Sequence, residues 1–222
     1  MKKVILVILF HVSFTSMAQD LVIQKKIKFL ALGDSYTIGE SVSPDQRWPV
    51  QLGTALKAKG VAVEDLQIIA TTGWRTDDLK KAMDAAHLMP GYTLVSLLIG
   101  VNNYYQGKSA ESYAHDFTGL LQTAIALAGG HTENVFVISI PDYGYTPFGK
   151  EKQTTISEGI DAFNAKNESI ARQLGVNYIF ITDISRRGLQ EPELVAGDGL
   201  HPSGKMYSLW VERILQQITF AP

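Results

Sequence analysis

Residues 27–36 read IKFLALGDSY, and this stretch decides the fold. The run from Ile27 to Leu32 is short and mostly apolar, so it predicts a buried strand that ends at Gly33. Asp34 and Ser35 follow the strand directly. In parallel α/β sheets the ligand-binding crevice lies outside the carboxyl ends of the strands. The stretch therefore predicts a polar site where this strand ends.

The alternation of apolar strand and amphipathic helix continues along the chain. The expected strands cover residues 27–32, 66–70, 92–99, 134–140 and 177–181, and the expected helices cover 48–59, 76–86, 109–128, 155–174 and 203–218. Thr76 is the expected N-cap of the second of these helices. The alternation predicts an α/β fold, a parallel five-stranded sheet with helices on both faces. No linker or repeat divides the chain, so residues 19–222 are expected to form one domain.

Residues 1–18 have the pattern of a secretory signal peptide. Lys2 and Lys3 give a positive start, Val4–Phe10 is an unbroken apolar run, and Ser16-Met17-Ala18 is a small-x-small cleavage site. The alternative is an uncleaved membrane anchor, which needs a longer apolar run than this one to span a bilayer. The sequence thus predicts export to the periplasm or the medium, with no membrane span after cleavage.

Composition argues against several classes of function. The formal net charge is −2, and no basic cluster resembles a nucleic-acid footprint, so no nucleic-acid partner is expected. His87, His115 and His131 are scattered without metal-ligand spacing, and the chain has no glycine-rich phosphate loop. Neither a metal nor a nucleotide cofactor is therefore expected. The sequence leaves the oligomeric state open.

Four short clusters stand at strand ends or just before the last helix: Gly33-Asp34-Ser35-Tyr36, Gly73-Trp74-Arg75, Gly100-Val101-Asn102-Asn103 and Asp198-Gly199-Leu200-His201-Pro202. Alone, the first cluster is equally well explained as a turn and each of the other three is better explained as a loop, turn or helix-cap region, because Gly, Asp, Ser and Asn are common turn residues. Together they bring a hydroxyl, backbone N–H groups, a carboxamide and an imidazole to one edge of the sheet. Asp198 stands three residues before His201, so its carboxylate can reach the imidazole Nδ1–H and fix the tautomer.

The order of these clusters resembles that of the SGNH (GDSL-type) hydrolases, whose sequence blocks contribute Ser, Gly, Asn and His in that order. The resemblance spans Phe29 to about Tyr207. It implies a flavodoxin-like three-layer α/β/α sandwich and the hydrolysis of esters or thioesters. By position it implies Ser35 as nucleophile, His201 as general base, Asp198 as its orienting partner, and an oxyanion hole formed by the Ser35 N–H, the Gly73 N–H and the Asn102 side-chain amide.

Two positions depart from the family pattern. Tyr36 replaces the usual Leu after the serine, and it is expected to pack rather than to react. Asn103 stands where the family usually has Asp, and an amide does not accept hydrogen bonds as a carboxylate does, which puts the support of Asn102 in doubt. Asp34 is expected to hold the turn by accepting backbone N–H bonds.

Aromatic residues gather in the predicted strand-end loops: Trp74, Tyr104, Tyr105, Tyr143, Tyr145 and Phe148. They could bind substrate, by stacking on sugar rings or lining an acyl slot, or they could pack against the rim of the sheet. The loop of residues 141–148 is the expected specificity wall. The loops are short, so short-chain acyl or O-acetyl esters are the expected substrates. The alternatives are lysophospholipids or thioesters with longer chains, and an inactive carbohydrate-binding module on the same fold.

Overall fold

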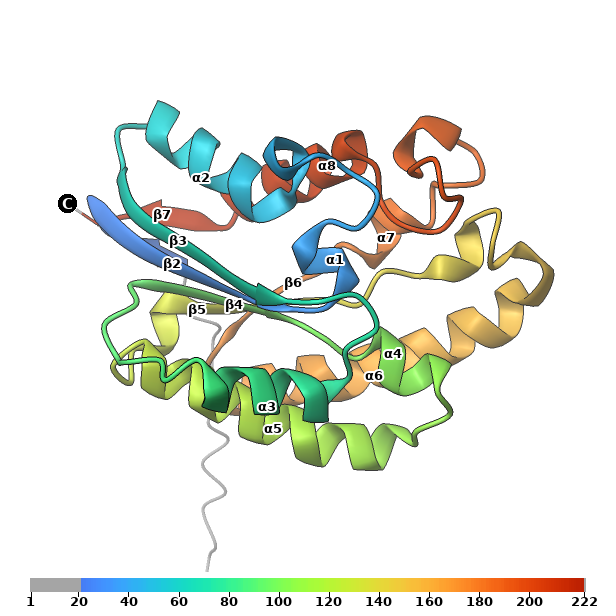
Figure 1. Ribbon diagram of the computed structural model, residues 1–222, viewed down its shortest axis with the longest axis horizontal. Coiled ribbons are helices and arrows are strands. Elements are labelled where there is room, and N and C mark those ends of the chain that lie inside the picture. Colours follow the sequence, from blue (N-terminus) through green and yellow to red (C-terminus); the bar gives the residue numbers. More distant parts are fainter. Residues whose placement is uncertain (1–20, 222) are drawn as a thin grey trace, which may run out of the picture.

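The computed structural model describes residues 21–221, and it has three layers (Figure 1). A central sheet lies between two layers of helices. The predicted signal segment, residues 1–18, lies outside the described residues. Within residues 21–221, no helix combines the length and the apolar character needed to cross a membrane.

The central sheet contains the five predicted strands, all parallel. They are β2 (Lys26–Gly33), β3 (Ala62–Ala70), β4 (Leu94–Leu98), β5 (Val135–Ile138) and β6 (Asn177–Ile179), in the spatial order β3-β2-β4-β5-β6. This is the flavodoxin-like order, so the predicted fold class is confirmed. The order reverses between β2 and β4, and the crevice beyond their carboxyl ends is where such sheets bind ligands.

Helices cover both faces of the sheet, as the alternation predicted. On one side lie α2 (Trp48–Ala58) and α8 (Gly204–Leu215), and on the other lie α3 (Thr76–Ala85), α5 (Ala110–Leu127) and α6 (Gln153–Gln173) (Figure 1). Ser109 and Ser203 cap α5 and α8 by accepting the backbone N–H groups of Ser112 and Met206. Helices on both faces explain why β4 and β5 are buried along their whole length and, apart from Ser96, consist of apolar residues.

Three details of the chain differ from the sequence-based expectation. Thr76 is the first residue of α3 and Arg75 is its N-cap; the Thr76 hydroxyl is hydrogen-bonded to the side chains of Asn103 and Asp116 rather than to a backbone N–H of the helix. The last helix ends at Leu215, and Ile218–Phe220 forms strand β7, which pairs in parallel with β1 (Leu21–Ile23). Short helices α1 (Ser35–Ile38), α4 (Val101–Tyr105) and α7 (Thr182–Ser185) follow β2, β4 and β6.

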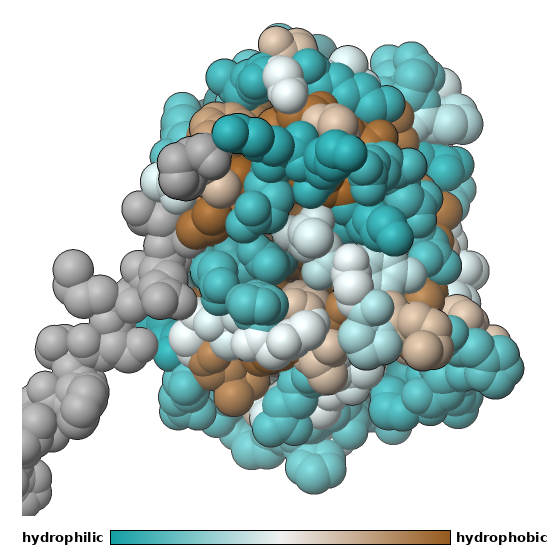
Figure 2. Space-filling view, turned by 90° about the vertical axis from the view of Figure 1, so that its left-hand side faces the viewer, coloured by the Kyte–Doolittle hydropathy of each residue, from teal (hydrophilic) through white to brown (hydrophobic). Residues whose placement is uncertain are grey.

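The core fills the space between the sheet and the helix layers. Trp48 of α2 is fully buried, and its ring lies 6.1 Å from that of Phe29 and 6.2 Å from that of Phe136. These contacts fix α2 against β2 and β5. Figure 2 views the molecule from the side of the β1–β7 pair, where hydrophobic residues form separate patches among hydrophilic ones. The four clusters singled out in the sequence lie at the other end of the sheet.

Candidate active site

Ser35 is the first residue of α1, directly beyond the carboxyl end of β2. Asp34 caps this short helix by accepting the Tyr36 N–H at 3.0 Å, as predicted for it. Gly33 is required at the strand end, because a Cβ there would lie 2.5 Å from the carbonyl oxygen of Leu98. The close approach of β2 and β4 at Gly33 therefore determines where Ser35 emerges from the sheet.

Asp34 is a fully buried carboxylic acid beside the nucleophile candidate. Burial raises the pKa of Asp34 to about 7, and the hydrogen bond from the Tyr36 N–H opposes this rise only in part. Its Oδ1 accepts the N–H of Tyr36, whereas its Oδ2 has no hydrogen-bond partner among the described residues. Asp34 is therefore a structural group whose charge is costly where it lies.

Asp198 and His201 are joined by a hydrogen bond within one turn before α8. The imidazole Nδ1 lies 2.6 Å from Asp198 Oδ2, while Oδ1 accepts the backbone N–H groups of Leu200 and His201 at 2.9 and 3.0 Å. Partial burial pushes the pKa of Asp198 upward. Hydrogen bonds from Ser41, from the His201 ring and from the backbone outweigh this effect, so the pKa lies well below its usual range. An ionised Asp198 keeps the proton on Nδ1 and leaves Nε2 free to accept one.

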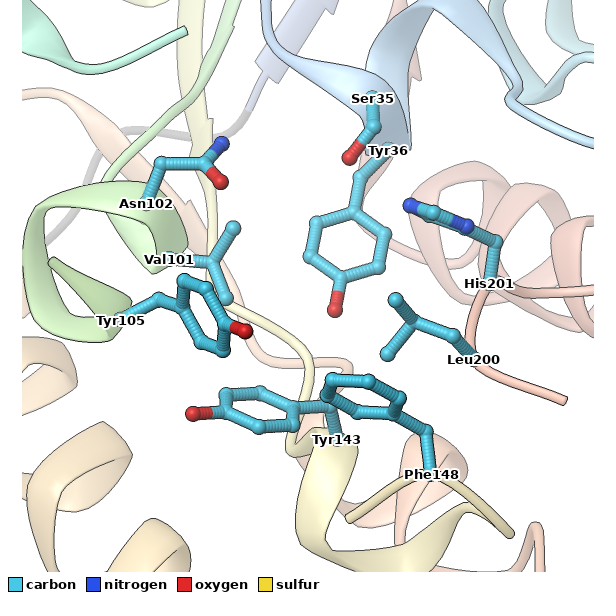
Figure 3. Close-up of a pocket in the computed structure, with 9 residues that line it drawn as sticks. All are labelled: Ser35, Tyr36, Val101, Asn102, Tyr105, Tyr143, Phe148, Leu200 and His201. Carbon is cyan, nitrogen blue, oxygen red and sulfur yellow. The ribbon is translucent and has the colours of Figure 1, made fainter. Parts of the chain in front are cut away.

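Ser35 and His201 come together at the mouth of a pocket (Figure 3). The figure shows the ring of His201 directed toward the side of Ser35, and Asn102 facing Ser35 across the opening. Between the described residues, no hydrogen bond of normal length joins the Ser35 hydroxyl to the imidazole. Such bonds are often long before substrate binds and shorten in the complex. The arrangement can supply a hydroxyl nucleophile with an adjacent base.

Asn102 is held at the end of β4 by a hydrogen bond to the neighbouring loop. Its Nδ2 donates one N–H to the carbonyl of Trp74 at 2.9 Å, which leaves the second N–H of the amide for another acceptor. Gly100 allows this turn, because its φ is +133° and a Cβ would lie 2.6 Å from the ring of Tyr113. The side-chain amide of Asn102 is thus oriented by the loop after β3.

Asn103 supports this corner, contrary to the doubt raised by the family pattern. Its Oδ1 accepts the Thr76 N–H at 3.1 Å, and its Nδ2 donates to the Thr76 hydroxyl at 2.7 Å. A carboxylate could accept the first bond but could not donate the second. The amide therefore ties α4 to the start of α3 through two hydrogen bonds, and Asn103 is almost fully buried.

Gly73 lies in the exposed turn after β3, with a φ of +85°. No atom lies within 4 Å of the position that a Cβ would take, so the space beside its backbone is open. Gly73 does not itself line the pocket, and Thr72 just before it donates a hydrogen bond to Glu40. Arg75 nearby is bound by Asp77 and Gln106, so its guanidinium is engaged within the protein.

The pocket has a volume of about 180 Å³ and a mostly apolar lining. It is lined by Ser35, Tyr36, Val101, Asn102, Tyr105, Tyr143, Phe148, Leu200 and His201 (Figure 3). Sequence reasoning did not select Val101 and Leu200, although each stands next to a residue that it did select. Tyr36 packs as expected but also lines the pocket, which was not expected.

Three of the six candidate aromatic residues line this pocket and three do not. Tyr105, Tyr143 and Phe148 contact one another with ring centroids 6.2–6.4 Å apart, and they form what we call the aromatic wall. Trp74 is half-buried outside the pocket. Tyr104 packs edge-on against Phe163 and donates its hydroxyl to the Thr155 carbonyl, and Tyr145 lies under the guanidinium of Arg186.

The loop that carries Tyr143 is fixed by the buried carboxylate of Asp142. Asp142 accepts the Gly144 N–H at 2.9 Å, the Ser157 hydroxyl at 2.7 Å and the Arg186 guanidinium at 2.9 Å. A buried carboxylate with this many partners holds its loop rigidly. Within the described part of the chain, no group of three or more His, Cys, Asp or Glu side chains could hold a metal ion.

Comparisons with known proteins show the family and the fold of the chain. Residues 31–209 match the GDSL-like lipase/acylhydrolase family. No curated protein matches the sequence. The crystal structure of TesA superposes with a TM-score of 0.69 at 18% identity, covering 86% of this chain and 97% of its own.

Two other solved structures share the fold. An acetylxylan esterase, Axe2 from Geobacillus stearothermophilus, has a TM-score of 0.67 at 16% identity, with 86% of this chain and 93% of that one covered. The psychrotrophic esterase EstA from Pseudoalteromonas sp., in a structure inhibited by monoethylphosphonate, has a TM-score of 0.65 at 17% identity, with 86% and 95% covered. The family match spans most of the chain and includes all four clusters at the carboxyl edge of the sheet, so the chain belongs to the GDSL-like lipase/acylhydrolase family and is a carboxylic ester hydrolase.

Proposed function

We propose that this protein is an exported serine esterase that hydrolyses short-chain acyl or O-acetyl esters through an acyl-enzyme on Ser35. The observation that carries the proposal is the meeting of Ser35 with the His201–Asp198 pair at the mouth of a small apolar pocket. Export rests on the signal-peptide pattern of residues 1–18, with the hydrolase domain beginning near residue 19.

In this mechanism His201 acts as general base and then as general acid. Its Nε2 removes the Ser35 proton as the hydroxyl oxygen attacks the ester carbonyl carbon. The imidazolium that forms is stabilised by the carboxylate of Asp198 at Nδ1. His201 then gives the proton to the leaving alcohol as the ester C–O bond breaks. Water repeats the two proton transfers on the acyl-enzyme and releases the acid.

Three N–H donors stabilise the negative charge that develops on the carbonyl oxygen. The Ser35 N–H belongs to the first residue of α1, where the helix itself provides no acceptor. The second donor is the Gly73 N–H, and the third is the Nδ2–H of Asn102 that Trp74 does not use. Such donors bind the transition state better than the neutral ester, and each is typically worth about 10²–10³ in turnover.

The size of the pocket supports a short acyl group. Its volume of about 180 Å³ is close to that of an apolar cavity that holds one benzene ring, roughly 150 Å³. An acetyl or butyryl group fits within that space, whereas a decanoyl chain does not. Tyr105, Tyr143 and Phe148 close the far side. An acyl chain longer than the pocket would have to displace this aromatic wall or extend into solvent, where it gains nothing from burial.

A second hollow favours the longer-chain alternative. It has a volume of about 370 Å³, lies behind the aromatic wall, and is lined by the same three rings together with Tyr104, Lys152 and Ile156 among others. If the wall moves, the two hollows would form one groove long enough for a lysophospholipid or a fatty acyl thioester. Long-chain acyl hydrolysis is therefore the second candidate function.

The test compares the purified protein with Ser35→Ala on p-nitrophenyl acetate, butyrate and decanoate. Ser169→Ala is the matched control, because Ser169 is exposed on α6 away from the pocket. We expect turnover of acetate and butyrate in wild type and in the control, and none above background in Ser35→Ala. Equal rates in wild type and Ser35→Ala would refute the serine esterase. A preference for decanoate would favour the second candidate.

A further inference from the structure

Ser41 links the segment after the nucleophile to the carboxylate of Asp198. Its hydroxyl donates to Asp198 Oδ2 at 2.6 Å, between residues 157 positions apart in the sequence. The same oxygen accepts the Nδ1–H of His201, also at 2.6 Å. Distances this short are typical of hydrogen bonds to a charged acceptor. The serine and the imidazole therefore share one carboxylate oxygen.

With Ser41 in place, every acceptor position of Asp198 is used. Oδ1 accepts the N–H groups of Leu200 and His201, and Oδ2 accepts the serine hydroxyl and the imidazole. A carboxylate offers about four such positions. Rotation of the carboxylate about its Cβ–Cγ bond would break all four bonds at once. Without the hydroxyl, Oδ2 would be held by the imidazole alone, the group that must be free to shift during proton transfer.

The backbone at Ser41 adopts a conformation that favours glycine. Its φ is +65°, in the left-handed region that residues with a Cβ rarely adopt, and Gly39 two residues earlier has a φ of +72°. A glycine at position 41 would adopt this conformation more easily but would bring no hydroxyl. Residues with strained backbones are common at functional sites, so a function is expected for this side chain. At Ser41 the hydrogen bond to Asp198 is that function.

Glu40, which lies between Gly39 and Ser41, contacts the opposite side of the site. Glu40 accepts a hydrogen bond from the hydroxyl of Thr72, which directly precedes Gly73. Residues 39–41 therefore contact both the turn that carries Asp198 and the turn that carries Gly73. This bend follows α1, whose first residue is Ser35. One short segment thus links three parts of the site.

We infer that Ser41 is a positioning residue, which holds Asp198 in the orientation that presents Oδ2 to the imidazole of His201. The effect on catalysis rests on the proposed function, whereas the hydrogen-bond geometry can be measured without turnover. Ser41 does not line the pocket, so its loss acts on kcat rather than on KM.

Three variants distinguish the effect of the Ser41 hydroxyl from the effect of its strained backbone. Ser41→Gly removes the hydroxyl, and glycine adopts the positive φ without strain. Ser41→Ala also removes the hydroxyl but keeps a Cβ on the strained backbone. Ser43→Ala is the control, because Ser43 is exposed and its side chain makes no cap hydrogen bond. On p-nitrophenyl acetate we expect kcat to fall about tenfold in both Ser41 variants, with KM unchanged, and to stay at the wild-type value in Ser43→Ala. A fall in Ser41→Ala alone would overturn the inference, because backbone strain would then be the cause.

Proton NMR gives a second readout that does not depend on turnover. A hydrogen bond between Nδ1 and a carboxylate gives a low-field proton resonance, assigned here by its loss in His201→Gln. In Ser41→Gly we expect this resonance to move upfield and broaden, because Asp198 is less constrained. An unchanged resonance together with an unchanged kcat would overturn the inference. If wild type lacks Ser35-dependent turnover while the resonance still changes, the proposed function fails and the positioning role of Ser41 stands.

Discussion

The rings of Tyr36 and His201 make an edge-to-face contact, with ring centroids 5.8 Å apart and ring planes at 63°. Tyr36 is buried, and in Figure 3 its hydroxyl points into the pocket. Tyr36 therefore contacts both His201, the proposed base, and the pocket proposed to hold the acyl group. The family's usual leucine at this position would have a smaller side chain and no aromatic contact with His201.

Replacing Tyr36 tests this double role. Tyr36→Leu enlarges the pocket, so we expect kcat/KM for butyrate to rise about tenfold relative to acetate, close to the discrimination that one or two methylene groups provide. Tyr36→Phe keeps the ring, so it should preserve the wild-type ratio between the two esters. Steady-state kinetics on both substrates measure this. If Tyr36→Leu leaves the ratio unchanged, the ring does not limit the acyl group.

Truncating the aromatic wall is expected to lengthen the accepted acyl chain. Phe148 is 54% exposed, so Phe148→Ala should change the free energy of unfolding by no more than about 1 kcal/mol. The change joins the pocket to the hollow behind it, and we expect a gain on the order of tenfold in decanoate hydrolysis with acetate hydrolysis little affected. Met89→Ala, at an exposed side chain outside both hollows, is the control. Loss of acetate and decanoate turnover alike would contradict the prediction.

Asp198→Asn keeps the shape of the turn but removes the charge that pairs with His201. The amide can present an N–H to Nδ1, which favours the wrong imidazole tautomer and leaves the imidazolium without its partner. We expect kcat to fall by roughly 10²–10⁴ with an unchanged circular dichroism spectrum. Asp45→Asn, at an exposed carboxylate remote from the pocket, serves as the control. Activity within a few-fold of wild type would remove Asp198 from the mechanism.

Asp34 should make the folded protein less stable as the pH rises. Its pKa is raised from 3.8 to about 7 in the folded state, so between these values the folded state binds more protons than the unfolded state. The free energy of unfolding must then decrease with pH. Between pH 5 and pH 8 we expect wild type to lose about 2–3 kcal/mol relative to Asp34→Asn, whose side chain carries no charge.

Urea unfolding of both proteins at the two pH values measures this difference. Comparison within the pair cancels the contribution of every other titrating group that the substitution leaves unchanged. If the free energy of unfolding depends on pH in the same way in both proteins, ionisation of the buried Asp34 carboxylate does not destabilise the folded state.

The sequence was most informative where burial imposes a simple pattern. The apolar runs of β4 and β5 reflect strands covered on both faces, and the glycines after helices mark their ends. The four- and five-residue helices α1, α4 and α7 are too short to show a helical period. The helix expected over residues 203–218 takes in only Ile218 of strand β7, because Ile218 continues that helix's apolar spacing, and the strand itself was not predicted.

At the site, the local motifs identified the polar residues but not their surroundings. Ser35, Asp198 and His201 stand in recognisable short clusters, whereas the pocket also depends on how α4 orients Val101 and how the turn before α8 orients Leu200. The contact between Ser41 and Asp198 joins residues 157 positions apart and has no local signal. The separation of the aromatic residues into wall and packing groups likewise depends on tertiary contacts.

The pairing of β1 with β7 has a consequence for the order in which the chain folds. Leu21–Ile23 has no place in the five-stranded sheet, and its partner strand is Ile218–Phe220. During synthesis the first strand must therefore wait until residues 218–220 have left the ribosome, almost the whole chain later. The β1–β7 pair therefore joins the two ends of the described domain, and its formation requires nearly the full length of the chain.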